Sequence, residues 1–273
     1  MLATFKEKPE EVLNVIWTCR EGPDSEVIGT TNGHNLYIVD LKTLKPETEL
    51  NDQIINCYLR LVTKKVDQVK KMVLCIDSFV LTDLTLKPKK KVSWLTKDEL
   101  EKYDFAVGCV NENAVHWIAI IFDIRSKCII IMDPLEEEQM LPRKQRAIEK
   151  CFNLFSKEKG MGTWAAQMAR NYPIQQDGTS CGVFCLKFIE RHLLQEDTNI
   201  PVNVNSERVD IGKNLILSLQ PKPFLSCYVC IQIPFNLRRC CKCMRTFHKD
   251  CKIQVTCTVC CHLNTSKTIK ALG

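Results

Sequence analysis

The chain has 273 residues, of which 45% are hydrophobic and 26% charged. This is the composition of a globular protein with room for one large core and a small appended module. No apolar run is long enough to span a membrane, and the opening residues carry acids where a secretory signal would be apolar. We therefore expect a protein without a membrane segment that acts inside the cell, in the nucleus, the cytoplasm or both.

Cysteine and charge are unevenly distributed along the chain. Nine of the 17 cysteines lie between Cys227 and Cys261. Residues 221–273 hold nine of the 38 Lys and Arg but one of the 32 Asp and Glu, which leaves 29 bases and 31 acids elsewhere. In a reducing compartment such a cysteine cluster indicates metal rather than disulfides. The C-terminal part is therefore predicted to be a separate basic module that begins after the PKP run at 221–223.

The predicted elements follow the spacing of the apolar residues. Asn51 or Asp52 is suited to cap a helix whose apolar face recurs through Val62. Short β-branched runs at 105–110, 115–122 and 127–132 predict strands, the last two of them adjacent and antiparallel. Further helices are predicted over residues 142–155, 181–194 and 206–219, and the second of these is apolar on more than one face, as expected of a buried helix.

Cys181 stands where the polar run YPIQQDGTS gives way to the predicted helix. With Ser180 as N-cap, the thiol would lie in the first turn, where free backbone amides and the helix dipole favour a thiolate nucleophile. The alternative is a small buried residue at the start of a core helix. Cys185, one turn later, is interpreted as core packing.

A nucleophilic thiol needs a base, and the chain has five histidines. His34 lies in a turn, and His192 lies far along the helix that begins at Cys181. His248 lies within the cysteine cluster and His262 beside it. His116 remains, on a predicted strand. Asp133 ends the next strand, where it either orients the imidazole or simply terminates the strand.

Four motifs resemble the ubiquitin-like-protein-specific cysteine proteases, the sentrin/SUMO-deconjugating family related to adenovirus protease. They are LNDQIIN at 50–56, HW at 116–117, Asp133, and Q-x2-G-x2-CGVF beginning at Gln175. The resemblance implies an α+β, papain-like and adenain-like protease fold over residues 30–220, with a central mixed sheet and a buried helix. Residues 1–29 would be an N-terminal extension.

The resemblance also implies roles. Cys181 is the nucleophile, His116 the general base and acid, Asp133 the orienting carboxylate, and Gln175 the oxyanion-hole donor, with Gln176 as the neighbour that a one-residue register error would substitute. Trp117, Asn51 and Asp52 would bind the substrate, although Trp117 is equally interpreted as an aromatic anchor of the sheet. The implied reaction is cleavage after the C-terminal glycine of a ubiquitin-like modifier, SUMO or a relative. It needs no cofactor, and the enzyme would act as a monomer on the modifier and its conjugates.

The chain departs from the family pattern at three places. Glu49 and Leu50 stand where the family usually has Trp before LND, Ser180 stands where Asp is common, and MDPL replaces the usual YDS. These variants resemble a divergent branch found in mobile-element-derived and domesticated genes. They leave open which modifier is preferred.

The C-terminal ligands form four pairs at metal spacing, namely Cys227-x2-Cys230, Cys240-x2-Cys243, His248-x2-Cys251 and Cys257-x2-Cys260. Eight such ligands suit two structural zinc ions. Their order resembles the treble-clef cross-brace of PHD and RING fingers, which implies that the first and third pairs share one zinc and the second and fourth the other. Residues 224–262 are thus a predicted two-zinc finger, and residues 263–273 a basic tail; Cys241 and Cys261 could replace their neighbours.

Several alternatives remain open at this point. The basic finger could bind nucleic acid, chromatin or an acidic partner, or its charges could only be solvated. The run KPKKKV at 87–92 is either a solvated loop or a nuclear import signal. The chain could also be an inactive protease-fold adaptor that binds nucleic acid or chromatin through the finger, or a Cys/His acyltransferase.

Overall fold

The computed structural model describes residues 8–18, 27–67, 71–87, 92–135, 140–220, 237–240, 246–248 and 269–271. The chain forms two compact units, one of residues 1–45 with 209–273 and the other of residues 46–208. The predicted protease domain of residues 30–220 thus contributes to both units, and the domain boundaries stay predictions.

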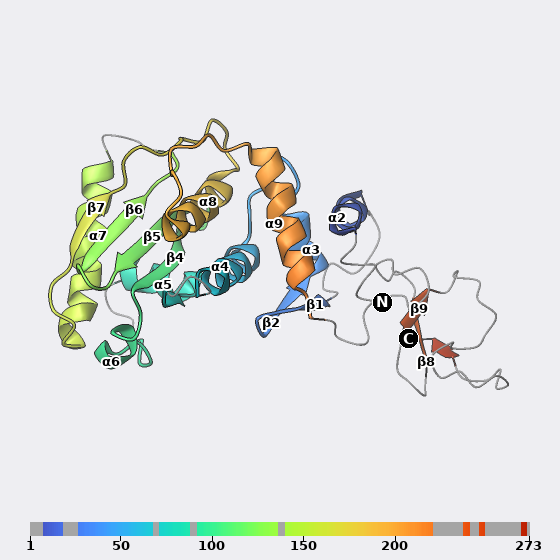
Figure 1. Cartoon of the computed structure of the whole chain (residues 1–273), viewed down its shortest axis with the longest axis horizontal. Helices are drawn as coiled ribbons and strands as arrows, with labels where there is room; N and C mark the ends of the chain where they lie inside the picture. The colour runs from blue at the N-terminus through green and yellow to red at the C-terminus, as the bar shows by residue number, and fades with distance from the viewer. Residues whose placement is uncertain are drawn as a thin grey trace. The chain divides into compact units, whose positions relative to one another are not determined.

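The second unit contains a five-stranded mixed sheet (Figure 1). Its strands, in spatial order, are β3 (Val73–Cys75), β4 (Phe105–Glu112), β5 (His116–Asp123), β6 (Cys128–Met132) and β7 (Ala165–Met168). The central pairs β4/β5 and β5/β6 are antiparallel, whereas the outer pairs β3/β4 and β6/β7 are parallel. The three predicted strands and the antiparallel pairing of the last two are confirmed.

Helices cover both faces of this sheet (Figure 1). The helices that pack on the strands are α4 (Asp52–Asp67), α5 (Ser78–Leu86), α7 (Leu141–Glu158) and α8 (Cys181–Leu194). The unit also contains α6 (Lys97–Leu100) and the start of α9 (Val204–Ser218). Side chains of α5 and α7 join one core with alternate residues of β4 and β5, such as Val110, Ile118 and Ile120. Helix α8 packs on β5, and nearly all of its residues are buried, as its apolar sequence predicts.

The outer edge of β7 is covered by polar side chains of α7. Asn153 accepts from the backbone N–H of Trp164 and donates to its carbonyl, both at 2.8 Å. One turn earlier Glu149 accepts from Ala166 N–H at 2.9 Å, and another turn earlier Gln145 donates to Ala166 O at 2.6 Å. Because residues four apart lie on one face of a helix, this ridge satisfies backbone groups that an edge strand would otherwise expose.

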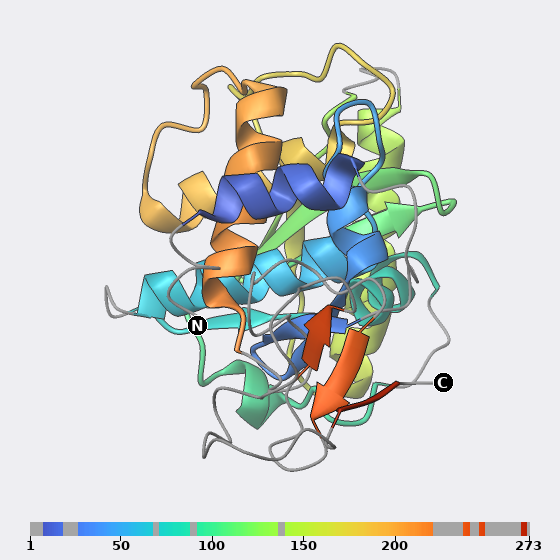
Figure 2. The same cartoon turned by 90° about the vertical axis from the view of Figure 1, so that its right-hand side faces the viewer.

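The first unit contains α2 (Pro9–Thr18), the hairpin β1 (Val27–Thr31) and β2 (His34–Tyr37), α3 (Ile38–Lys42), the end of α9, and a sheet of β8 (Leu237–Cys240), β9 (Thr246–His248) and β10 (Ile269–Ala271). Helix α2 crosses α9 at Gly212, where a Cβ atom would lie 2.6 Å from Leu13 (Figure 2). Glycine therefore allows this close approach, and a larger residue would require the Leu13 side chain to shift. Within the described ranges, no helix is both long and apolar enough to cross a membrane.

Candidate active site

A thiol, an imidazole and a carboxylate meet where three elements of the second unit begin or end. His116 is the first residue of β5, Asp133 directly follows β6, and Cys181 is the first residue of α8. The Nε2 atom of His116 lies 2.6 Å from Oδ1 of Asp133, and the Cys181 side chain is close enough to the imidazole to raise its pKa. All three residues are at most 9% exposed. The structure therefore brings the three predicted catalytic residues together in the predicted order.

A tight turn places His116 at the end of its strand. Glu112 on β4 is paired with His116 on β5, and the two residues after Glu112 adopt left-handed conformations, with φ of 55° at Asn113 and 62° at Ala114. Such values suit asparagine, but an alanine is strained there. Since hairpin geometry fixes the strand register, this turn determines which face of the sheet His116 occupies.

The charges of the site stabilise an imidazolium. Burial alone lowers the pKa of His116, but the hydrogen bonds and charges of Asp133 and Cys181 raise it from 6.5 to about 9. For Asp133, burial raises the pKa, but the hydrogen bonds from His116 and Lys144 outweigh it and lower the pKa to about 2. The imidazole is therefore protonated at neutral pH beside an ionised carboxylate, as required of the partner of a thiolate.

The loop before the nucleophile is organised by Asp177. Its Oδ1 accepts from the N–H groups of Thr179 and Ser180 at 2.7 and 2.8 Å, and its Oδ2 accepts from the Ser180 hydroxyl at 2.7 Å. Ser180 occupies the N-cap position of α8 but makes no side-chain capping bond. The expected capping by Ser180 is wrong in this respect, because Asp177 binds its hydroxyl. The first-turn amides of α8 are thus left without a Ser180 side-chain acceptor.

Gln175 lies beside this loop, and its backbone N–H donates to Pro134 O at 3.0 Å, next to Asp133. Its Nε2 donates to Asp177 O at 2.6 Å, while its buried Oε1 has no hydrogen-bond partner. An amide nitrogen carries two hydrogens, so one remains for another acceptor. Gln176 is exposed instead, so the alternative register is not favoured.

One contact fixes the nucleophile helix to the strand of the base. Cys185, one turn after Cys181, donates its S–H to Trp117 O at 3.2 Å. Burial, followed by the hydrogen bond with Cys109, raises the pKa of Cys185 well above 9, so it remains a thiol donor at neutral pH. Cys185 is thus a core residue, as interpreted from the sequence, and it also sets the register between α8 and β5.

The predicted substrate-binding residues cluster at the start of α4. Trp117 is buried, and its indole N–H donates to Leu50 O at 2.8 Å. Asn51 accepts from Ile54 N–H at 3.1 Å and so caps α4, while Asp52 is half-buried at its first position. The indole contact is that of an anchor in the sheet, and the contact of these three residues with a substrate stays a prediction.

Two cations beside the site, one partly buried and one fully buried, were not predicted from the sequence. Lys144, on α7, contacts Oδ2 of Asp133 and lies 3.0 Å from a carboxylate oxygen of Glu112. Arg208, on α9, has 0% exposure and donates to Thr179 O at 3.1 Å. Neither belongs to a motif, and only the folded chain brings them near residues distant in the sequence.

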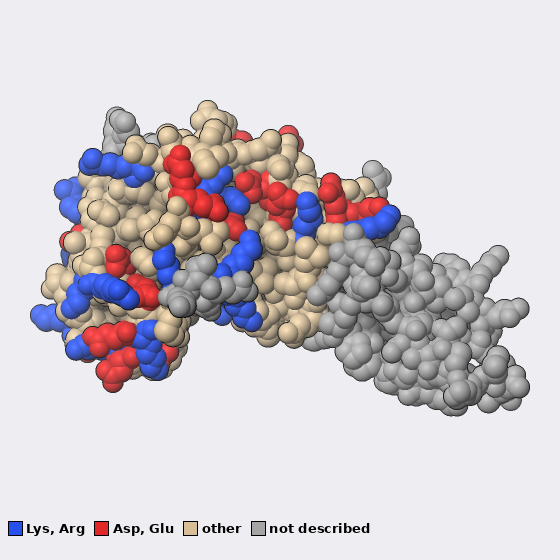
Figure 3. Space-filling view, viewed as in Figure 1, with Lys and Arg blue, Asp and Glu red and all other residues tan. Residues whose placement is uncertain are grey.

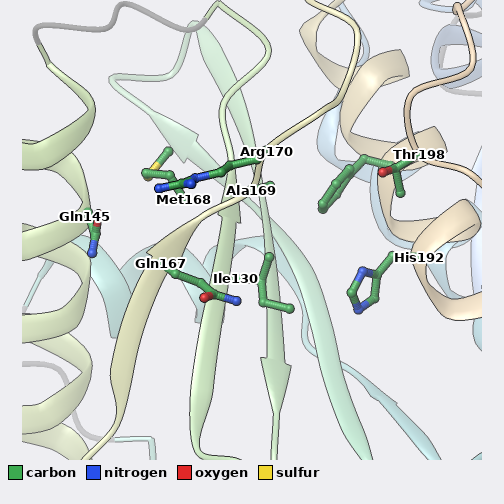
Figure 4. A pocket seen from close by; sticks show the side chains of 9 residues that line it. Ile130, Gln145, Gln167, Met168, Ala169, Arg170, His192 and Thr198 are labelled. Carbon is green, nitrogen blue, oxygen red and sulfur yellow. The ribbon is translucent and has the colours of Figure 1, made fainter.

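A pocket of about 600 Å³ lies elsewhere in this unit and contains none of the predicted catalytic residues (Figure 4). Ile130 and Gln167 of the sheet lie on one side of it and His192 of α8 on the other, and Phe188 and Arg170 also line it. Burial lowers the pKa of His192, which favours the neutral ring. His192 is remote from the thiol, as expected from its place on the helix.

The predicted zinc ligands fall almost entirely outside the described residues. This holds for Cys227, Cys230, Cys243, Cys251, Cys257 and Cys260, while the backbone of Cys240 and His248 is described in β8 and β9. Among the residues that the structure describes, no group of three or more His, Cys, Asp or Glu is arranged to hold a metal ion. The finger stays a prediction.

Known proteins match part of the chain. A sentrin-specific protease of Caenorhabditis elegans is 29% identical over 158 residues, which cover 55% of this chain and 22% of that protein. Ubiquitin-like-specific protease ESD4 of Arabidopsis thaliana is 25% identical over 182 residues, which cover 60% of this chain and 37% of that protein. The chain thus spans between about a fifth and two fifths of the length of these relatives.

The fold also matches a solved structure, the C-terminal Ulp1 protease domain in complex with Smt3, the yeast ortholog of SUMO. The TM-score is 0.63 at 20% identity, and the match covers 78% of this chain and 95% of that one. The family model of the Ulp1 protease C-terminal catalytic domain matches residues 48–214, which hold all four predicted catalytic residues. By this match over more than half of its length, the chain belongs to the Ulp1 protease family.

Proposed function

We propose that the chain is a cysteine protease that cleaves after the C-terminal glycine of a ubiquitin-like modifier, SUMO or a relative. The observation that carries the proposal is the buried group of Asp133, His116 and Cys181, in which the imidazole bonds to the carboxylate and has its pKa raised by both Asp133 and Cys181. Family membership supports it, as do the names of the relatives, which are proteases of sentrin or of ubiquitin-like proteins.

The reaction is acyl transfer through a thioester. The Cys181 thiolate attacks the carbonyl carbon of the terminal glycine, and the developing oxyanion accepts from the Cys181 N–H and from the second hydrogen of the Gln175 amide. His116 gives its proton to the leaving amine as the C–N bond breaks. It then takes a proton from water, which attacks the thioester and releases the modifier's carboxylate and the thiol. Asp133 stays ionised throughout and holds the ring.

Modifier choice is expected to depend on the start of α4. Leu50 is 2% exposed, and its carbonyl accepts from the indole of Trp117. We infer that Trp117 forms one wall of the passage for the modifier's tail and that Asn51 and Asp52 lie at its entrance. Glu49, directly before the LND motif, stands where the family usually has tryptophan. Preference for a modifier other than SUMO is therefore compatible with the same chemistry.

Electrophilic probes made from SUMO, ubiquitin and other ubiquitin-like proteins test the proposal. Each carries a propargyl group in place of the terminal carboxylate. The wild-type chain should form an adduct with at least one probe at Cys181, located by mass spectrometry, whereas Cys181→Ala should form none and keep its circular dichroism spectrum. Absence of any adduct with the folded wild type, together with nucleic-acid binding, would instead favour the inactive adaptor.

We also propose two structural zinc ions in the C-terminal finger. The described backbone supports separate ions for the second and third ligand pairs, because β8 and β9 form an antiparallel hairpin in which Leu237 is opposite His248. Cys240 and His248 therefore lie at opposite ends of the hairpin, about 10 Å apart at the rise of a strand. This backbone separation is compatible with a different ion for each of the two pairs. Metal analysis of the purified chain should give two zinc per chain.

The finger is further proposed as the site of any nucleic-acid, chromatin or acidic protein partner. Over the part of the surface described in Figure 3, acidic and basic side chains are interspersed, whereas residues 221–273 carry nine bases and one acid. We place the protein inside the cell and treat residues 30–220 as the protease domain. Binding to DNA that persists in a Cys181→Ala chain and is lost on zinc chelation would support this role.

A further inference from the structure

Lys144 connects two carboxylates beside the imidazole. Its Nζ contacts Oδ2 of Asp133 and lies 3.0 Å from Oε2 of Glu112, and its side chain is 14% exposed. Glu112 is paired with His116 across the β4/β5 hairpin. The Lys144 ammonium group thus joins Glu112, at the end of β4, to Asp133, which follows β6. His116 begins β5, the strand between these two.

The position of Lys144 is unfavourable within its own helix. It lies in the first turn of α7, which contains no acidic residue, and a positive charge at a helix N-terminus opposes the helix dipole. Burial also disfavours the charged form and lowers the pKa of Lys144, but the hydrogen bonds to Asp133 and Glu112 outweigh it and raise the pKa. A residue that conflicts with its local preference but is satisfied by distant partners is expected at functional sites.

Asp133 is held by several hydrogen bonds, of which that from Lys144 is one. Oδ1 accepts from His116 at 2.6 Å and from Leu135 N–H at 3.2 Å, and Oδ2 accepts from Lys144. The hydroxyl of Tyr172 donates to the backbone carbonyl of Asp133 at 3.2 Å. Since both carboxylate oxygens are bonded on fixed elements, the carboxylate cannot rotate without breaking a bond, and the imidazole it holds keeps one orientation toward Cys181.

We propose that Lys144 is a positioning residue for the reaction, which holds Asp133 ionised and in one orientation and, as the second cation on that carboxylate, limits the pH range over which His116 keeps its proton. The inference rests on the proposed function. The charged and titratable groups around this pair are Glu112 on β4, Lys144 on α7, and Cys181 and Cys185 on α8.

Three variants separate this role from a structural one. Lys144→Met removes the charge but keeps a linear side chain, Lys144→Arg keeps the charge, and Lys150→Met is the control, an exposed lysine on the same helix. The readout is the rate of Cys181 alkylation by iodoacetate relative to iodoacetamide between pH 5 and 11. An anionic reagent is favoured while the imidazolium persists, so the ratio falls as His116 loses its proton.

For Lys144→Met we expect the pH at which the iodoacetate-to-iodoacetamide ratio falls to rise by about one unit, because a cation that repels the imidazolium is lost. Probe labelling should fall about tenfold, because Asp133 is less well held. In Lys144→Arg and in the control Lys150→Met, the ratio should fall at the same pH as in the wild type. If the ratio falls at the wild-type pH in a folded Lys144→Met chain, the inference is overturned.

A second variant covers failure of Lys144→Met to fold. Glu112→Gln removes an anion from the same cluster, so the fall in the ratio should move to lower pH, opposite to the shift for Lys144→Met. A shift upward or no shift would overturn the inference. Alkylation requires no modifier, so a wild-type chain that shows the ratio change but labels with no probe would count against the proposed function and leave the role of Lys144 testable.

Discussion

Replacing Asp133 by asparagine keeps the size of the side chain but removes the charge 2.6 Å from His116. Because burial alone lowers the pKa of His116, its rise from 6.5 to about 9 depends on Asp133 and Cys181. At about 1.4 kcal/mol per pH unit, this rise corresponds to about 3 kcal/mol of interaction that favours the imidazolium. In Asp133→Asn the pKa of His116 should return toward 6.5 or below, and the ring is free to take the wrong tautomer.

The assay is kcat/KM for a modifier-derived fluorogenic substrate between pH 5 and 10.5. The wild type should lose activity with an alkaline limb near pH 9, as His116 loses the proton that it gives to the leaving amine. Asp133→Asn should have its alkaline limb about two pH units lower and a rate at pH 7.5 reduced by about 10² to 10⁴. An alkaline limb that stays near pH 9 in the variant would refute the assignment of that proton to the His116–Asp133 pair.

The same pair makes stability depend on pH, and the sign differs for the two residues. The pKa of His116 is raised on folding, so its contribution is full below pH 6.5 and is lost as pH rises through about 9. The pKa of Asp133 is lowered, so its contribution is full above pH 3.8 and is lost as pH falls through about 2. Asp133→Asn should therefore reduce the free energy of unfolding most between pH 4 and 6.5, and less above pH 9.

Three further substitutions test the packing that supports the site by urea unfolding. Asn153→Ala leaves the backbone N–H and carbonyl of buried Trp164 without partners and should cost about 2 to 4 kcal/mol; a cost near zero would contradict the edge-covering role of α7. Gly108→Ala would place a Cβ 2.7 Å from the backbone oxygen of Ile76 and should cost about 1 to 3 kcal/mol, unless the sheet shifts freely. Ala114→Gly relieves a φ of 62° and should stabilise by about 0.5 kcal/mol, and destabilisation would show that the turn is unstrained.

The elements predicted correctly are those whose packing depends on their own residues. Strands β4 to β6 have continuous apolar, β-branched sequences, and α4 and α7 have apolar residues at helical spacing, so burial and periodicity are both visible in the sequence. Strand β7, with the sequence AAQM, lacks this signal. It is a strand because β6 pairs with one of its edges and α7 side chains bond to the other, and neither partner is adjacent in the sequence.

The site was predictable to a similar extent. The types and order of Cys181, His116 and Asp133 are readable, because each lies at the boundary of a recognisable element. The contribution of Lys144 could not be predicted, because its partners are carboxylates 11 and 32 positions away in the chain. The role of the Ser180 hydroxyl also differs from the prediction. Instead of capping α8, it donates to Asp177 in the preceding loop.

Contacts to backbone carbonyls beside the predicted catalytic residues help to fix the geometry of the site. The carbonyl next to His116, that of Trp117, accepts from Cys185, and the carbonyl next to Asp133, that of Pro134, accepts from Gln175 N–H. Backbone acceptors are present whatever side chain occupies the position. Neither contact involves the predicted substrate-binding residues Asn51 and Asp52, so substitutions there should leave the thiol beside the imidazole. Low overall identity is thus compatible with one conserved fold, and modifier specificity can change separately from the chemistry.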